Sequence, residues 1–264
     1  MNLLTYIMFV LLTACAPQAA ELGGPITTSI KAPAGGSSFD HTGFDALLKA
    51  HVRNGRVDYT GLRTRLPTLK AYTARLATAD LSKLTRNERL ALLINAYNAF
   101  TLELMLEPGT LPASIRDLPD PWKQVRWTLA GERVSLDNIE HGLIRPLFHD
   151  PRIHFAVNCA SVGCPPLRAG AFTGKGLSEQ LDAVTRTTLQ NPRYARVEGT
   201  TLVLTKILDW YGSDMTAGES TPRADTVAAW VALYSTDEVK ALVNTAGGRP
   251  TVTFGRYDWT LNGQ

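Results

Sequence analysis

The stretch from Arg86 to Leu106 is the feature that most constrains how this chain can fold. Its apolar residues cover nearly the whole circumference of a helix, and a helix that is apolar all round must be buried. Thr85 and Glu88 have the spacing of a capping box at its start, and Pro108-Gly109 ends it. The sequence therefore predicts a long central helix that the rest of the fold encloses.

Two carboxamides, Asn95 and Asn98, lie inside this predicted helix. A buried carboxamide must find hydrogen-bond partners, because leaving it unpaired away from water costs free energy. Both side chains are therefore expected to bond to whatever packs against the helix, and a nearby histidine is one candidate.

The stretch from Asp150 to Leu167 concentrates polar chemistry in an otherwise apolar segment. It holds two of the three cysteines, Cys159 and Cys164, and one of the five histidines, His154. We predict a short strand from Arg152 to Val157 that runs into a tight loop of small residues. A fold needs no such loop to bury a core, so the candidate functional site is placed here.

Helices outnumber strands in the rest of the chain, and the strands come partly as hairpins, at 125–134 and 195–204. A helix is expected from Leu136 to about Arg145 and a terminal strand at 251–254. This pattern predicts an α+β fold, with the buried central helix packed on a small antiparallel or mixed sheet.

The 264 residues are 44% hydrophobic, which is enough for one globular domain with a core of its own. The net charge is only +3, and the charges are mixed along the chain without a basic run or an aromatic-basic stripe. No nucleic-acid partner is therefore predicted.

The first fourteen residues are predicted to be a signal peptide. Leu3 to Leu12 is almost wholly apolar, too short to span a bilayer and of the length of a signal h-region. It leads into Leu12-Thr13-Ala14-Cys15, which resembles the lipobox of bacterial lipoproteins and marks Cys15 for lipidation. A plain secretory peptide with an incidental cysteine is the alternative, because no Lys or Arg precedes the apolar run.

Residues 15–38 are rich in Ala, Gly, Pro, Thr and Ser, and we predict a flexible tether there. Residues 39–264 are then a single globular domain. If Cys15 is lipidated, the membrane is a partner of the chain. Because Ala16 rather than Asp follows Cys15, resemblance to enterobacterial sorting implies the periplasm-facing side of the outer membrane.

Five stretches together resemble the bacterial domain-of-unknown-function family 547 (DUF547): LINAYNA (93–99), DNIEH (137–141), HFAVNCASVGCPPL (154–167), GRVDY (55–59) and YDWTLN (257–262). The resemblance covers about Phe39 to Asn262. It implies that relatives are often secreted or lipidated, and it names no activity. We further expect a likeness to the papain and transglutaminase-like fold.

One hypothesis is thiol catalysis. A cysteine nucleophile needs a base, and the base needs an orienting group. Cys164 or Cys159 would be the nucleophile and His154 the base, and the small loop residues would leave backbone amides free for an oxyanion. Candidates that would orient the imidazole are Asn95, Asn98 and Glu140.

Two observations oppose a resting thiol. The predicted buried helix carries no cysteine, whereas papain-like enzymes have their nucleophile at its start. Cys159 and Cys164 are also an even pair in a chain predicted to enter an oxidising compartment, and only four residues separate them. A structural or reducible Cys159–Cys164 disulfide is the alternative to a free nucleophile.

Two other interpretations of the histidines stay open. Glu140, His141 and His154, with Asp150 or His149, could hold a metal, but their spacing matches no zinc signature. His154 could also be a structural histidine bonded to Asn95 or Asn98. We predict no metal site and no cofactor.

The leading hypothesis is a tethered module that binds a peptide-like or cell-wall ligand or an envelope protein partner. An envelope Cys-His hydrolase or acyltransferase is the alternative. The five tryptophans are expected to pack the core, whereas a cluster of them at a pocket rim would suit a glycan or peptide ligand. The residues predicted to contact a ligand are Asn98, Asn158, Cys159, Ser161 and Arg168.

Overall fold

Helices and small sheets are combined in the computed structural model, which describes residues 24–264 and confirms the α+β class. The α-helices are α1 Pro25–Lys31, α2 Thr42–His51, α3 Tyr59–Thr64, α4 Leu66–Ala77, α5 Arg86–Leu106, α6 Arg145–Phe148, α7 Leu177–Leu189, α8 Ile207–Trp210, α9 Gly212–Thr216, α10 Val227–Ala232 and α11 Asp237–Thr245. The strands are β1 Val52–Arg53, β2 Arg56–Val57, β3 Trp127–Leu129, β4 Glu132–Val134, β5 Ala195–Glu198, β6 Thr201–Leu204 and β7 Thr251–Phe254.

Short helical turns connect these elements. Four are 3₁₀ helices: η1 Leu81–Lys83, η2 Ile115–Asp117, η4 Pro151–Phe155 and η5 Gly174–Gly176. The turn η3, Asn138–Ile144, is a π-helix that leads directly into α6. The predicted helix from Leu136 to Arg145 is therefore present over most of its length, but its main part is wound more widely than an α-helix.

Helix α5 begins and ends where the sequence predicts and is buried over almost its whole length. The Thr85 hydroxyl accepts a hydrogen bond from Glu88 N at 3.2 Å, as expected of the cap. The Glu88 carboxylate does not complete the capping box; it accepts from Gly174 N of η5 at 2.7 Å. The cap side chain thereby fixes a second segment against the start of α5.

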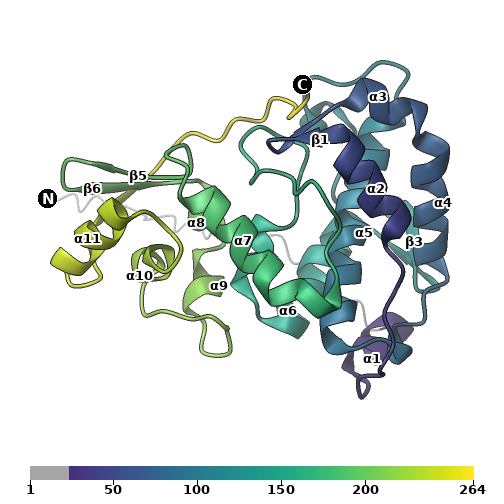
Figure 1. Ribbon diagram of the computed structural model, residues 1–264, viewed down its shortest axis with the longest axis horizontal. Coiled ribbons are helices and arrows are strands. Elements are labelled where there is room, and N and C mark those ends of the chain that lie inside the picture. The colour runs from purple at the N-terminus through teal and green to yellow at the C-terminus, as the bar shows by residue number, and fades with distance from the viewer. Residues whose placement is uncertain (1–23) are drawn as a thin grey trace, which may run out of the picture.

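The sheet of β5, β6 and β7 lies at the opposite end of the molecule from α5 (Figure 1). Strands β5 and β6 pair antiparallel, and β6 and β7 pair parallel, so the sheet is mixed. Helix α5 packs instead on α4, α7, η3 and η5. It reaches the β3–β4 hairpin through Phe100, which stacks on Trp127 at 4.9 Å. A helix that is apolar all round needs cover on every side, and neighbouring helices provide most of it.

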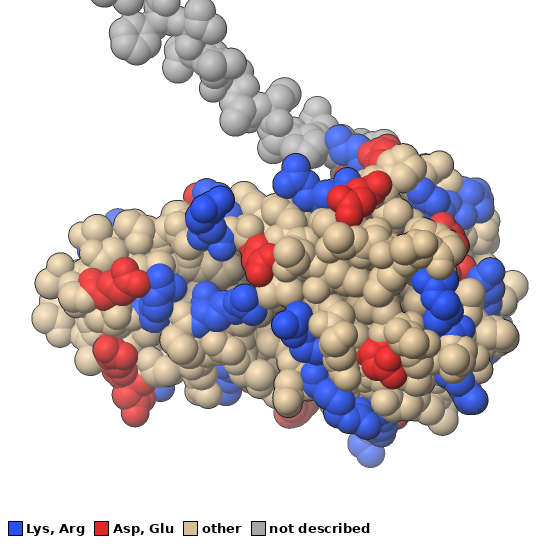
Figure 2. All heavy atoms as spheres, turned by 90° about the horizontal axis from the view of Figure 1, so that it is seen from above, with Lys and Arg blue, Asp and Glu red and all other residues tan. Residues whose placement is uncertain are grey.

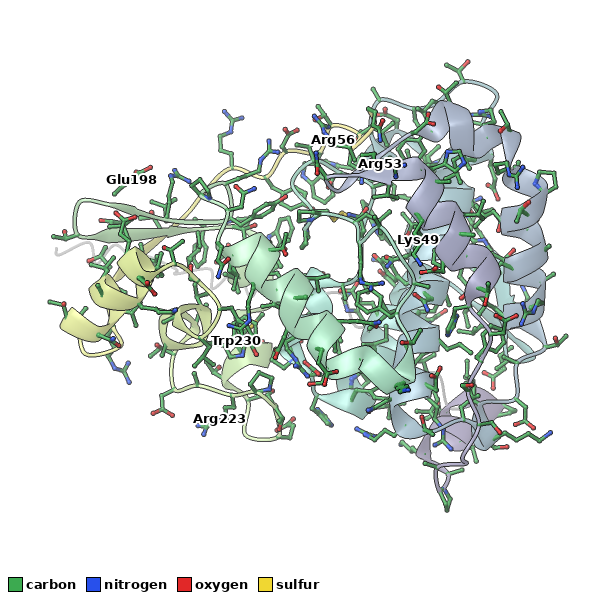
Figure 3. All side chains as sticks on the ribbon, in the orientation of Figure 1. Lys49, Arg53, Arg56, Glu198, Arg223 and Trp230 are labelled. Carbon is green, nitrogen blue, oxygen red and sulfur yellow. A yellow bond between two sulfur atoms is a disulfide. The ribbon has the colours of Figure 1, made fainter. Side chains whose placement is uncertain are left out.

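The predicted strand from Arg152 to Val157 is wrong, because this segment forms the 3₁₀ helix η4. Asp150 caps the turn by accepting from Arg152 N at 3.0 Å, and Pro151 occupies its first position. Nearly all of its side chains are buried, so the segment has no alternation of apolar and polar residues that would distinguish a strand from a helical turn. Phe155 stacks at 5.7 Å on Trp230 of α10, which is labelled in Figure 3, and so joins η4 to the sheet-bearing half.

The predicted tether needs a correction over its described part. Residues 25–31 form α1, and Ile26 and Ile30 are buried in the core. Arg89 of α5 donates hydrogen bonds to the carbonyls of Ile30, Ala32 and Pro33, which holds the segment in place. The packed domain therefore begins before Phe39. The predicted signal peptide and Cys15 lie outside the described residues.

The last segment of the chain runs back from β7 across the molecule to the β1–β2 hairpin (Figure 1). On the way it bonds to the cysteine loop, since Gly163 N donates to Asp258 O and Val162 N donates to Thr260 O, both at 2.8 Å. A Cβ atom at Gly163 would lie 2.9 Å from Asp258 N, so only glycine fits without a shift. The end of the chain therefore closes over the loop that carries both cysteines.

Charged side chains are interspersed on the face shown in Figure 2, where basic and acidic groups lie among uncharged ones. Within residues 24–264, none of the helices has both the length and the apolar character that crossing a membrane requires. On this face, the mixed charge expected from the sequence is confirmed.

Candidate functional site

A cleft of about 320 Å³ brings together the segments that the sequence singled out. Its polar residues include Glu140 and His141 of η3 and His154 of η4, and both sulfur-bearing residues, Cys159 and Cys164, also line it. Aromatic side chains supply much of the remaining wall: Tyr97, Trp122, Trp210, Tyr211, Tyr257 and Trp259. Its lining residues range from Tyr97 of α5 to Trp259 near the end of the chain, so segments far apart in the sequence build it.

His154 is an almost fully enclosed titratable group of the cleft, with a side chain only 1% exposed. Its Nε2 lies 2.8 Å from Asp214 Oδ2. Its Nδ1 has no hydrogen-bond partner among the described residues, and the nearest carboxylate oxygen in an ion-pair contact is Glu140 Oε1 at 3.9 Å. The ring stacks on Tyr211, with centroids 4.2 Å apart. One ring nitrogen is thus fixed and the other is free.

Asp214 fixes the tautomer of His154. Burial alone would raise the pKa of Asp214, but hydrogen bonds from Arg145 and His154 outweigh it and hold the pKa well below its usual value. The Arg145 contact is bidentate, with Nε–Oδ2 at 2.7 Å and Nη2–Oδ1 at 2.8 Å. Because Asp214 is ionised, it accepts the hydrogen bond from His154 Nε2–H, and in this tautomer of the imidazole the ring lone pair lies on Nδ1.

Glu140 of η3 faces Nδ1 of His154. Burial raises the pKa of Glu140, and the charges of His154 and Arg145 oppose that shift only in part. Hydrogen bonds from Tyr97 and Tyr211 also oppose it. The site therefore contains a carboxyl group whose pKa is set by burial and by the charges and hydroxyl groups around it.

The π-helix η3 places Glu140 and His141 in the cleft lining. Its last turn is closed by Arg145 N donating to Glu140 O, five residues back. Along one side of it, Arg145 Nη1 lies 3.1 Å from His141 Nδ1, and His141 Nε2 lies 3.9 Å from Asp137 Oδ1. Burial and the Arg145 charge lower the pKa of His141. Such widened turns occur frequently at functional sites.

Cys159 and Cys164 form a disulfide, with Cα atoms 6.3 Å apart. Tyr257 from the end of the chain places its hydroxyl 3.2 Å from the Cys159 sulfur and 3.3 Å from the Cys164 sulfur. The same hydroxyl lies 2.9 Å from Ser161 Oγ. The predicted structural bridge is confirmed, and in this state neither cysteine is a nucleophile.

Neither Asn95 nor Asn98 of α5 forms a hydrogen bond with His154 among residues 24–264; each holds a backbone segment instead. Asn95 donates to Phe172 O at 2.8 Å and accepts from Phe172 N at 2.9 Å. Asn98 donates to Ala156 O at 2.9 Å and accepts from Asn158 N at 2.8 Å. The expectation that these amides find partners in neighbouring segments is confirmed. The orienting role assigned to them falls to Asp214.

The other residues predicted to contact a ligand lie around the cleft rather than in it. Asn158 shapes the cysteine loop by donating to Pro165 O and accepting from Ala160 N. Ser161 is buried beneath Tyr257. Arg168 donates to Ala171 O and lies over Phe172, outside the cleft lining. Of that predicted set, Cys159 alone is a lining residue.

Sequence reasoning missed Asp214, Tyr211 and Tyr257 as members of the site. Asp214 lies in a short helix 60 residues beyond His154, and an isolated Asp in a polar segment gives no signal. The tryptophans were a usable signal, since Trp122, Trp210 and Trp259 do gather at the cleft while Trp127 and Trp230 are buried. Among residues 24–264, no group of three or more His, Cys, Asp or Glu residues could hold a metal ion.

Comparison with known proteins gives one match. Residues 81–188 match the family model described as "Protein of unknown function, DUF547", which confirms the predicted resemblance over that segment. The matched segment includes Glu140, His154 and both bridged cysteines, whereas Asp214 and Tyr257 lie beyond it. No curated protein and no solved structure matches the chain, so the likeness to papain stays a prediction.

Proposed function

We propose that this chain, with its DUF547 domain, is an envelope-anchored module that binds a small peptide-like or cell-wall ligand in the cleft around His154. The observation that carries the proposal is the composition of the cleft. Aromatic rings form its walls, and a few convergent polar groups, Glu140, His141 and His154, line it as well. Concave, largely apolar sites with a small number of placed polar groups are typical of small-molecule sites.

The aromatic wall supports a ligand rather than a purely structural cavity. Trp210 is 43% exposed, although a tryptophan that served only packing would be covered. Its ring lies 4.9 Å from that of Tyr257 and 6.0 Å from that of Trp259, so three large rings share one rim. Exposed, clustered aromatic rings are the surfaces that peptides and sugars stack on.

Intrinsic fluorescence tests the binding proposal, because Trp122, Trp210 and Trp259 line the cleft. Titration with soluble peptides and cell-wall fragments is expected to change the emission of the wild type. Trp210→Ala should weaken binding about fivefold or more, since losing a stacking ring removes roughly 1 kcal/mol or more. Phe254→Ala removes an exposed ring on β7 and should leave the affinity unchanged. Equal weakening by both variants would contradict binding in the cleft.

A second candidate is a thiol hydrolase or acyltransferase that acts only after the bridge is reduced. It is favoured because both cysteines line the same cleft as His154, whose Nδ1 lone pair is oriented by Asp214. After an added dithiol has reduced the bridge, His154 would take the proton of the attacking thiol, and the thiolate would add to an amide carbonyl. His154 would return the proton to the leaving amine as the C–N bond breaks, and water or a second amine would release the acyl group from the thioester. Reduced protein should then cleave amide substrates, with loss of activity in His154→Gln. Absence of cleavage by fully reduced protein would exclude this candidate.

Anchoring through Cys15 rests on the lipobox-like sequence alone and has its own test. Full-length protein made in a bacterial host should partition into the detergent phase after extraction. Cys15→Ser should move it to the aqueous phase without changing the binding curve of the cleft. Aqueous partitioning of the wild type would remove the anchor and leave the binding proposal intact.

A further inference from the structure

We propose that the ligand presents a primary ammonium group, which sits between the Glu140 carboxylate and the free ring nitrogen of His154. This inference rests on the proposed binding function and names the chemical class that the cleft selects. It is carried by a gap between two acceptors, by the charges that line the cleft and by the rings that surround it.

The gap lies between the unpartnered Nδ1 of His154 and the Glu140 carboxylate, which accepts hydrogen bonds from Tyr97 and Tyr211 and has further lone pairs. His154 Nδ1 is buried without a partner, and Nε2 is already engaged with Asp214. Glu140 Oε1 lies 3.9 Å from Nδ1, which is too far for a direct hydrogen bond. A ligand group that bridges Nδ1 and this carboxylate needs at least two hydrogens on one atom. A primary ammonium group supplies three such donors.

The formal charges of the cleft favour a cation. Asp120, Asp137 and Glu140 line it, against a single lysine, Lys123. Arg145 does not line the cleft, and its guanidinium is bound by Asp214 on both nitrogens that face that carboxylate. A bound cation would stabilise the ionised form of Glu140 and offset the cost of burying that charge. A ligand carboxylate at the same place would face Glu140 and be repelled.

The rings add an attraction that a cation can use. Tyr211 lies against His154, and Trp210, Tyr257 and Trp259 form the connected rim. The face of an aromatic ring carries negative potential, so a cation over it is stabilised by roughly 0.5–2 kcal/mol. Rings together with carboxylates therefore point to an ammonium group more than to a neutral sugar or an anion.

Matched pairs of probes test the inference on the full chain. Trialanine and N-acetyl-trialanine differ only in the amino group, as do glucosamine and N-acetylglucosamine, and 1,5-diaminopentane is an amine without either scaffold. Calorimetric titration should show at least tenfold tighter binding by the free amine of a pair. The pair that shows the difference identifies a peptide or an amino sugar as the source, and binding of the diamine alone identifies a simple amine.

The variant Glu140→Gln keeps the shape of the side chain and removes its charge. This variant should bind the free amine of a pair only as tightly as it binds the acetylated probe. Glu198→Gln is the matched control, because Glu198 lies at the outer end of the β5–β6 hairpin (Figure 3) and is exposed; it should keep the preference. Thermal melting of each variant shows whether the fold is retained. If Glu140→Gln does not fold, Asp137→Asn in the same lining should weaken the preference instead.

Two results would overturn the inference, and only one of them would also contradict the proposed binding function. Equal binding of free and acetylated probes would exclude the ammonium site and leave the binding function standing. Binding of no probe, with wild-type fluorescence unchanged in every titration, would overturn the inference and the proposed function together.

Discussion

At the scale of single residues, Asp214 holds the candidate site together. Asp214→Ala would leave the Arg145 guanidinium and the His154 Nε2 proton without their acceptor. We expect a loss of about 3 kcal/mol in the free energy of unfolding, because breaking a largely buried charge pair strands its partner. Urea unfolding measures it. Asp209→Ala, which removes an exposed pair with Lys206, should cost less than about 1 kcal/mol. Equal losses would contradict a special role for Asp214.

A second residue, His41, should make stability depend on pH. Burial lowers its pKa from 6.5 to about 4, so the unfolded chain takes up a proton at a higher pH than the folded protein does. The free energy of unfolding therefore contains the full contribution of His41 above about pH 6.5. This contribution is lost as the pH falls from 6.5 towards 4, and below about pH 4 the free energy no longer changes because of His41. The total loss should be about 3 kcal/mol.

Urea unfolding of wild type and His41→Gln at several pH values checks this expectation. The variant removes the titrating group and should flatten the difference between pH 7 and pH 4.5. His149→Gln is the matched control, because His149 lies at the surface near Glu219 and should leave the slope as it is. Parallel curves for wild type and His41→Gln would show that another group causes the dependence.

Residue-level prediction from the sequence named residues that share one cleft where these residues lie close together in the chain. Glu140, His154 and the cysteine pair lie within 25 residues, and all of them line the cleft. It failed for contacts set by tertiary packing. The sequence does not show that Asp214 rather than Asn95 is the hydrogen-bond partner of His154, because nothing in the residues around either one indicates which segment folds back onto the imidazole.

At the scale of elements, three sets of interactions hold the cysteine loop in place. They are its disulfide, the contacts of the Tyr257 hydroxyl and the backbone hydrogen bonds to the last segment of the chain. Reducing the bridge should lower stability by about 2 kcal/mol, the chain-entropy value for so short a loop, without unfolding the protein. Urea unfolding with and without reductant measures this. Cys159→Ser combined with Cys164→Ser should reproduce the reduced value and be insensitive to reductant. A reductant effect that persists in this double variant would contradict the assignment.

Helix α5 and the turn η4 are joined by Asn98, whose two bonds no other residue replaces in the described structure. Asn98→Ala should cost about 3 kcal/mol, because it leaves the buried carbonyl of Ala156 and amide of Asn158 unpaired. Thermal or chemical unfolding measures it. Asn244→Ala, on the exposed side of α11, should change stability by no more than about 0.5 kcal/mol. Similar losses would show that the clamp contributes little.

These two elements also show what a sequence can predict about local structure. The bounds of α5 follow from a hydroxyl cap, an apolar circumference and a Pro-Gly stop, each a local signal. The turn η4 has the same apolar density in only five residues, which is too short for a period to be counted. The π-helix η3 was likewise expected as an ordinary helix, since both windings use the same residues.

At the scale of the whole molecule, residues 24–34 belong to the domain and not to a free linker. Ile26 and Ile30 are buried, and three of the carbonyls bound by Arg89 belong to this segment. Ile26 N also donates to the Glu132 carboxylate of the β3–β4 hairpin. Composition alone predicts a tether here, because a short helix with two buried apolar side chains gives no recognisable pattern in a stretch rich in Gly, Pro and Thr.

A chain that begins at Phe39 should therefore be less stable than one that begins at Gly24. Removing residues 24–38 exposes the surface that Ile26 and Ile30 cover, roughly 2 kcal/mol for each side chain. It also leaves the buried Arg89 guanidinium with only the carbonyls of Leu81 and Ser82. We expect the shorter chain to unfold with at least 3 kcal/mol less free energy, or to fail to fold. Urea unfolding of the two chains measures the difference. Arg89→Met in the longer chain should give part of the same loss in the free energy of unfolding. Indistinguishable unfolding curves for the two chains would show that the domain begins at Phe39.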